Sequence, residues 1–164
     1  SFPPGRPLLD ALLDLMHRIH AEFRFDAVAT NVATPLSRVL ELRSGVCQDF
    51  AHLAVGALRA LGLPARYVSG YLETLPPPGR PKLIGADASH AWLEAWVPDA
   101  GWLGFDPTND QMPTMQYVTV ACGRDYGDVA PLKGVIFGGG DHTLTVAVDV
   151  TPEPRAGEGE SQHA

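Results

Sequence analysis

The segment Ser44-Gly45-Val46-Cys47-Gln48-Asp49-Phe50-Ala51 decides how this chain of 164 residues folds and what it can do. A turn signal at Ser44 and Gly45 gives way there to apolar residues at helical spacing, which continue until Gly62-Leu63-Pro64. Ser44 is a candidate cap, so we expect Cys47 in the first turn of a helix. Unpaired N–H groups and the positive end of the helix dipole favour the reactive thiolate at that place. Cys47 is therefore a candidate nucleophile.

A second segment supplies a histidine and an aspartate. The runs Ser89-His90-Ala91-Trp92-Leu93-Glu94-Ala95-Trp96-Val97 and Trp102-Leu103-Gly104-Phe105-Asp106-Pro107-Thr108 flank the turn residues Pro98-Asp99-Ala100-Gly101. Their aromatic and β-branched content predicts an antiparallel hairpin. His90 begins one strand and Asp106 ends the other, so their side chains should meet. Without such a partner, a lone cysteine at a helix start is more often a small buried hydrophobe than a catalyst.

The spacing of His90 and Asp106 makes a demand on this hairpin. Side chains alternate between the two faces of a strand, so a four-residue loop would set Asp106 opposite Leu93, on the other face from His90. We therefore predict a loop with an odd number of residues, or a β-bulge. A regular four-residue loop would contradict the His90–Asp106 pair.

Cysteine, histidine and aspartate in this order provide attack, proton relay and orientation in nucleophilic acyl transfer. The three blocks resemble the transglutaminase-like superfamily, whose bacterial members carry Gly-Val-Cys with a polar pair and alanine, then Ser-His-Ala-Trp, then Phe-Asp-Pro-Thr. The resemblance also takes in the block from Gly123 to Pro131. It implies a papain-like core, amide chemistry through a thioester, and Cys47, His90 and Asp106 as the catalytic triad.

Apolar periodicity predicts three helices, over residues 7–23, 35–43 and from Cys47 to the Gly62 turn. Strands are expected at 65–72, in the two hairpin runs, at 115–122 and at 143–150. The proline-rich connection 73–88 is expected to be a mobile surface loop, which either borders the cleft or is a plain excursion. The expected fold class is α+β, with N-terminal helices packed on a mostly antiparallel sheet of about five strands.

Three parts are expected along the chain: a linker over residues 1–7, a transglutaminase-like domain over 8–151, and a disordered tail over 152–164 that lacks apolar content. The chain opens without an initiator methionine or a hydrophobic signal segment, so we expect it to be part of a longer, cytoplasmic protein. The net charge of -7 and the absence of a Lys/Arg cluster argue against nucleic acid or an anionic membrane as partner. A peptide or protein amide is the expected substrate.

Two departures refine the expected activity. Gln48 stands where animal cross-linking members of the family have tryptophan, so a protease- or amidase-like reaction is favoured over protein cross-linking. The motifs do not distinguish water from an amine as the acyl acceptor. No calcium-binding loop pattern is present, and neither a metal nor another cofactor is expected.

Two alternatives stay open. The same fold can serve as a catalytically silent protein-binding module, although the presence of all three triad residues argues against it. A zinc site made of Cys47, His52 and His90 lacks any recognised ligand spacing. The second cysteine, Cys122, is expected to be a core residue at a strand end.

Further residues are candidates for substrate binding or support of the triad: Gln48, Asp49, Trp92, Asp125 and Tyr126. Asp49 lies on a core-facing helix and needs a polar partner, so we expect it to anchor a neighbouring loop. Trp92 shares a strand face with His90 and is either a wall of the cleft or a plain core residue. By family resemblance the Cys47 backbone N–H binds the oxyanion, with Asn31 or Thr34 as candidates for the second donor.

Overall fold

The computed structural model describes residues 1–75, 78–79, 87–130, 134, 137–138 and 147–153. The helices come first, and they are α1 (Leu8–Glu22), α2 (Leu36–Leu42) and α3 (Cys47–Ala60). Two short strands interleave with them, β1 (Arg24–Phe25) and β2 (Ser44–Gly45). The longer strands follow, and these are β3 (Ala65–Leu72), β4 (Ala88–Val97), β5 (Gly101–Phe105) and β6 (Tyr117–Gly123). A short helix, α4 (Tyr126–Val129), comes after them.

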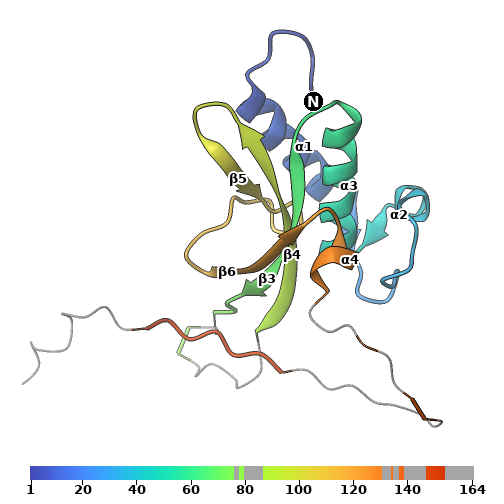
Figure 1. Cartoon of the computed structure of the whole chain (residues 1–164), viewed down its shortest axis with the longest axis vertical. Coiled ribbons are helices and arrows are strands. Elements are labelled where there is room, and N and C mark those ends of the chain that lie inside the picture. The colour runs from blue at the N-terminus through green and yellow to red at the C-terminus, as the bar shows by residue number, and fades with distance from the viewer. Residues whose placement is uncertain (76–77, 80–86, 131–133, 135–136, 139–146, 154–164) are drawn as a thin grey trace, which may run out of the picture.

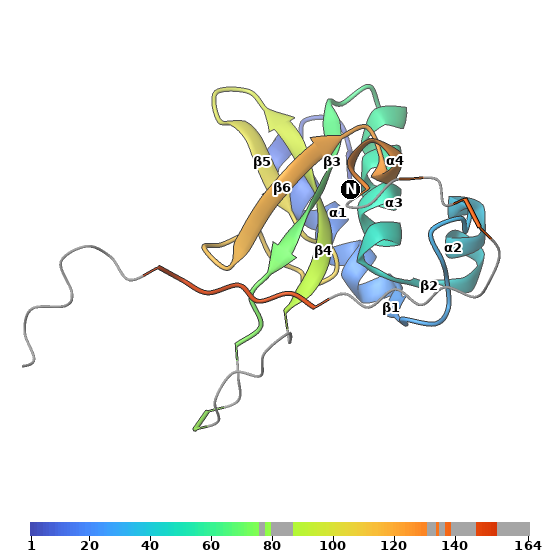
Figure 2. The same cartoon turned by 60° about the horizontal axis from the view of Figure 1, so that its bottom comes forward.

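The longer strands form an antiparallel sheet in the order β5-β4-β3-β6, and β1 pairs with β2 in parallel. Helix α3 packs on β3 and β4, and α1 packs on α3 and β5, so the helices gather on one side of the sheet (Figures 1 and 2). The predicted α+β class and the three predicted helices are confirmed. The strand predicted at 143–150 and the loop predicted at 73–88 lie largely outside the described residues, as does most of the predicted tail.

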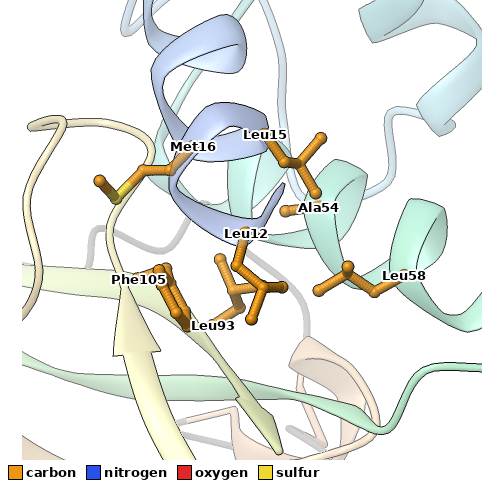
Figure 3. Close-up of a pocket in the computed structure, with 7 residues that line it drawn as sticks. All are labelled: Leu12, Leu15, Met16, Ala54, Leu58, Leu93 and Phe105. Atoms are coloured by element: carbon orange, nitrogen blue, oxygen red, sulfur yellow. The ribbon is translucent and has the colours of Figure 1, made fainter. Parts of the chain in front are cut away.

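The core between α1, α3 and the β4–β5 hairpin fixes the position of α3 relative to the sheet. A small cavity there is surrounded entirely by apolar side chains (Figure 3): Leu12, Leu15, Met16, Ala54, Leu58, Leu93 and Phe105. Burial of each large apolar side chain stabilises the fold by about 1.5–3 kcal/mol, so a shift of α3 away from the sheet would cost much of this free energy. Because Cys47 begins α3 and His90 lies on β4, this apolar contact sets the distance between thiol and imidazole.

The hairpin prediction is confirmed. Pairing of Val97 with Gly101 leaves a three-residue loop, and Leu93 pairs with Phe105. Asp99 (φ 65°) and Gly101 (φ 81°) take left-handed conformations that turn the chain this tightly. Asp106 follows Phe105, and continuing the register by one residue sets it beside Trp92, on the same strand face as His90.

Two expectations from the sequence are wrong. Ser44 does not cap α3, because it lies in β2 and donates its hydroxyl hydrogen to the Arg24 carbonyl; Val46 is the N-cap residue. Cys122 is exposed rather than buried. Its neighbour Ala121 packs on the helix side of the sheet, so alternation along the edge strand β6 turns Cys122 to the opposite side, toward solvent.

Candidate active site

The start of α3 is held by Asp49 rather than by a cap before the helix. The Asp49 carboxylate is 3% exposed and accepts hydrogen bonds from the Val46 N–H (2.9 Å) and the Thr30 hydroxyl (2.5 Å). It thereby ties the loop after β1 to the first turn of the helix. A Cβ at Gly45 would lie 2.6 Å from the same carboxylate, so only glycine fits there. The Gly-Val-Cys sequence thus sets Cys47 as the first residue of α3.

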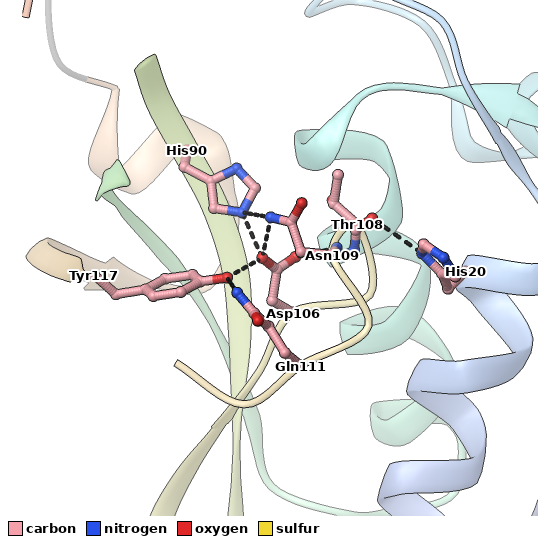
Figure 4. Close-up of polar contacts among 7 residues, drawn as sticks. All are labelled: His20, His90, Asp106, Thr108, Asn109, Gln111 and Tyr117. Carbon is pink, nitrogen blue, oxygen red and sulfur yellow. Dashed lines mark hydrogen bonds and ion pairs between the residues drawn. The ribbon is translucent and has the colours of Figure 1, made fainter. Parts of the chain in front are cut away.

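His90 and Asp106 form a buried pair. The His90 ring is 9% exposed, and its Nε2 atom lies 2.7 Å from Asp106 Oδ2 (Figure 4). The indole of Trp92 stacks on the imidazole, with ring centroids 6.1 Å apart and an interplanar angle of 29°. The stacking contact with Trp92 and the hydrogen bond to the Asp106 carboxylate together fix the plane of the His90 ring.

Asp106 is fully buried, at 0% exposure, and is surrounded by donors. The Tyr117 hydroxyl (2.6 Å) and the Asn109 side-chain amide (2.8 Å) donate to Oδ2, and the Thr108 N–H (2.9 Å) donates to Oδ1. The Gln111 amide in turn donates to the Tyr117 hydroxyl at 2.7 Å. A buried carboxylate with this many donors is held in its charged form and in one orientation.

Electrostatics keep the pair charged. Burial lowers the pKa of His90, but the hydrogen bonds to Asp106 and Cys47 and their negative charges outweigh burial and raise the pKa to about 9. Burial likewise raises the pKa of Asp106, yet the bonds from His90, Tyr117 and Asn109 bring it below its ordinary value. At neutral pH the site therefore holds an imidazolium beside a carboxylate.

The loop that carries Asp106 is fastened to α1 by two histidines one turn apart. His17 pairs with Asp110, and the His20 ring lies 3.0 Å from the Thr108 carbonyl oxygen (Figure 4). Both ring contacts span more than eighty residues of sequence, so no local sequence pattern points to them. The contacts position the Asp106 loop against the helical layer.

A pocket of about 270 Å³ opens where α3 meets the sheet, and we call it the thiol pocket. Its walls come from α3, β3, β4, α4, the N-cap of α3 and the loop between β1 and α2. The residues that form them are Val32, Val46, Cys47, Gln48, Tyr67, Ser69, Ser89, His90, Ala91 and Tyr126. Cys47 is half-buried and faces the same space as His90. No carboxylate stands among these residues, so the pocket presents a thiol, an imidazole and neutral polar groups.

The structure brings some of the predicted support residues to this pocket and not others. Gln48 and Tyr126 line it, whereas Trp92 lies behind His90 and is almost fully buried. Asp125 is exposed and caps α4 by accepting the Gly127 N–H. It supports the backbone that carries Tyr126 and does not reach the pocket wall.

The candidates for a second oxyanion donor are not found at the pocket. The Asn31 side chain accepts a hydrogen bond from the Ala33 N–H, and the Thr34 hydroxyl accepts one from the Asn31 N–H. Both side chains therefore stabilise the turn in which they lie. Neither lines the thiol pocket. The short-range bonds follow from the preference of Asn and Thr for nearby backbone groups.

Several functional neighbours escaped the sequence analysis, and they fall into two groups. One group surrounds Asp106, and its members are Asn109, Gln111 and Tyr117. The other lines the thiol pocket, and it consists of Tyr67, Ser69 and Ser89. His52, which the sequence offered only as a zinc ligand, packs on the Tyr67 ring. Asn109 had a usable signal, since it follows the Asp-Pro-Thr block directly and such turns bond back to their first carboxylate. Tyr67 and Tyr117 had none, because their partners lie far away in sequence.

Within the described ranges, no three His, Cys, Asp or Glu side chains are arranged to hold a metal ion. In the same part of the chain, none of the helices has the length and apolar content to cross a membrane.

Removing the Asp49 carboxylate should loosen the start of α3. Asp49→Ala leaves the Val46 N–H and the Thr30 hydroxyl without their acceptor, which should lower the free energy of unfolding by about 1–3 kcal/mol. Urea titration followed by circular dichroism measures this change. Asp125→Ala is the matched control, because it removes an exposed cap from a four-residue helix and should cost under about 1 kcal/mol. Equal losses in the two variants would contradict an anchoring role.

Comparison with known proteins shows which sequences and structures this chain is similar to. A family profile described as the transglutaminase-like superfamily matches residues 4–107. An uncharacterized protein of Mycobacterium tuberculosis is 48% identical over 169 residues, which cover 100% of this chain and 52% of the relative. A protein-glutamine gamma-glutamyltransferase of Pseudomonas aeruginosa is 33% identical, and the similarity covers 66% of this chain and 19% of the Pseudomonas protein.

Among solved structures, a candidate cysteine protease from Cytophaga hutchinsonii is similar with a TM-score of 0.63 and 34% identity. That similarity covers 75% of this chain and 39% of the Cytophaga chain. The chain spans about half the length of the mycobacterial relative.

Proposed function

Because the chain belongs to the transglutaminase-like superfamily, we propose that it is a thiol enzyme that transfers the acyl group of an amide to water or to an amine. The substrate is a peptide or protein amide. Cys47 is the nucleophile, His90 moves the proton and Asp106 orients the imidazole.

One observation carries the proposal. His90 contacts Asp106 through Nε2 at 2.7 Å while it lines the same pocket as the Cys47 thiol. An imidazole with one nitrogen on a buried carboxylate has only Nδ1 left to exchange a proton with a thiol. A buried structural histidine would need neither the thiol nor an open pocket beside it.

The reaction follows from these positions. The Cys47 sulfur attacks the carbonyl carbon of the amide, so a C–S bond forms and the carbonyl oxygen becomes an oxyanion. The C–N bond then breaks, and the leaving nitrogen takes a proton from the His90 imidazolium. Water or an amine gives a proton back to His90 as it attacks the thioester, and the C–S bond breaks to release Cys47.

Hydrolysis is the favoured second step. Gln48 follows the nucleophile where the animal cross-linking enzymes resembled by this sequence have tryptophan. The similar proteins differ in the acyl acceptor that their names imply, since the Pseudomonas protein is named as a glutamyltransferase and the Cytophaga protein as a candidate cysteine protease. Supplying hydroxylamine beside water, and measuring hydroxamate against free acid, gives the preference directly.

The first test is alkylation of Cys47 by iodoacetamide between about pH 5 and about pH 10, because only the thiolate reacts. A Cys122→Ser background is needed, since that second thiol is exposed. In the proposed pair the His90 cation stabilises the thiolate, so Cys47 should react rapidly at about pH 6. In His90→Ala the rate at about pH 6 should fall at least about tenfold.

His20→Ala provides the comparison for that experiment. It removes an exposed imidazole that contacts the Asp106 loop but not the thiol, so the pH dependence of alkylation should stay close to that of the parent. If alkylation is slow in the parent and equally slow in His90→Ala, a catalytically silent protein-binding module explains the fold better than a thiol enzyme does.

A further inference from the structure

We propose that the hydroxyl of Tyr67 is the second donor to the oxyanion, beside the Cys47 backbone N–H. This inference rests on the proposed acyl transfer and names a residue that binds its intermediate. Tyr67 lies on β3, has no part in the Cys-His-Asp set, and lines the thiol pocket with Cys47.

The Tyr67 ring is held in one place. The residue is 2% exposed and packs with Ala51 of α3, Ala91 of β4 and Val129 of α4, and Cys47 lies against the same cluster. The ring of His52 lies on it with centroids 4.6 Å apart and an interplanar angle of 30°. A donor fixed from three elements costs little reorganisation when charge develops on a substrate.

The hydroxyl is available to a ligand. Nearly all buried polar groups in proteins have a hydrogen-bond partner. Across the part of the chain that the structure describes, the Tyr67 hydroxyl has no such bond, and it is not among the unpaired atoms that are closed off from solvent. The Tyr117 hydroxyl, by contrast, is taken up by Asp106 and Gln111. The Tyr67 hydroxyl is therefore a donor on a residue of the pocket wall that no described group takes up.

The chemistry of the pocket keeps this group a donor. Burial above all, followed by electrostatic interaction with Cys47, Tyr126 and Asp49, raises the pKa of Tyr67 above its ordinary value. The phenol consequently keeps its hydrogen throughout the range in which His90 is charged. Tyr67 and Cys47 line the same pocket.

The first donor comes from the helix itself. Cys47 is the first residue of α3, so its N–H has no acceptor within the helix. When the Cys47 sulfur bonds to a carbonyl carbon, the oxygen takes the electron pair of the C=O bond. The Cys47 N–H and the Tyr67 hydroxyl then donate to that oxygen, and the proton on His90 remains for the leaving nitrogen.

A peptide aldehyde tests the role of Tyr67 without a known substrate. The Cys47 thiol adds to the aldehyde carbonyl and forms a hemithioacetal, in which a tetrahedral carbon carries the former carbonyl oxygen. Its binding is measured as protection of Cys47 from iodoacetamide in the Cys122→Ser background. In Tyr67→Phe, the aldehyde concentration needed to protect Cys47 should rise about ten- to hundredfold. This is the effect expected when one hydrogen bond to a charged oxygen is lost. Alkylation without aldehyde should stay within about twofold, because displacement of iodide at a saturated carbon creates no oxyanion.

Tyr71→Phe is the matched control, since Tyr71 is half-buried on the same strand but does not line the pocket. Equal protection in Tyr67→Phe and its parent would overturn the inference. Faster alkylation in Tyr67→Phe would also overturn it, because the hydroxyl would then restrain the thiol. Failure of the aldehyde to protect a rapidly alkylated parent would overturn it as well. Slow alkylation indifferent to His90 would instead remove the proposed function itself.

Discussion

Cys47→Ala should keep the fold and lose turnover of any amide or ester substrate, by a factor of about 10⁵ or more. Without the sulfur no acyl-enzyme can form, and His90 and Asp106 alone do not supply a nucleophile. The fold should survive because Cys47 is half-buried and the start of α3 is held by Asp49. Alanine is also the best helix former. Turnover of a glutamine-containing peptide, with hydroxylamine present, measures the loss.

The second thiol provides the control. Cys122→Ser changes an exposed side chain on the edge strand, away from the thiol pocket, and should leave turnover unchanged within about twofold. Urea titration of both variants shows whether the loss is chemical or structural. Turnover in Cys47→Ala at the rate of the parent would end the hypothesis of a thiol nucleophile.

The sequence could predict what depends on local pattern. The Gly-Val-Cys turn and the apolar spacing after it place Cys47 at a helix start, and the structure has it as the first residue of α3. The parity argument for His90 and Asp106 required an odd loop, and the loop has three residues. Both arguments use periods of backbone geometry, which depend on neighbours in sequence.

The sequence could not predict what depends on long-range pairing. Ser44 reads as a cap, but parallel pairing of Ser44 with Arg24 draws it into β2 and leaves the helix start to Asp49. Cys122 reads as core, but its place in the edge strand, facing away from the helices, follows only from the order of strands. Likewise the Tyr117 hydroxyl reaches Asp106 because the loop after β5 folds back toward β6.

Asp106→Asn should give a folded protein whose turnover falls about 10²- to 10⁴-fold and whose pH profile changes. The hydrogen bond to Asp106 heads the contacts that raise the pKa of His90 to about 9 against the opposing effect of burial. With a neutral amide in its place, burial prevails and the imidazolium is lost at lower pH. The alkaline decline of kcat/KM should therefore move from about pH 9 toward neutrality.

Tyr117→Phe is the matched comparison for that variant. It removes one of the donors to Asp106 but keeps the ring that lies against His90 and Trp92. The carboxylate stays, so turnover should fall only a few-fold and the alkaline decline should stay near pH 9. An unshifted profile in Asp106→Asn would mean that the carboxylate does not hold the charge on His90.

Stability should report the same pair with a defined sign. The pKa of folded His90 lies above its ordinary value of 6.5, so its contribution is complete below about pH 6.5 and is lost as pH rises through about 9. The pKa of folded Asp106 lies below its ordinary value of 3.8, so its contribution is present above that pH and is lost as pH falls through the folded pKa. The difference in unfolding free energy between parent and Asp106→Asn should thus be greatest between about pH 4 and about pH 6.5 and shrink toward pH 9. Urea titrations across this range check it, and a difference that grows with pH above 6.5 would contradict a charged His90–Asp106 pair.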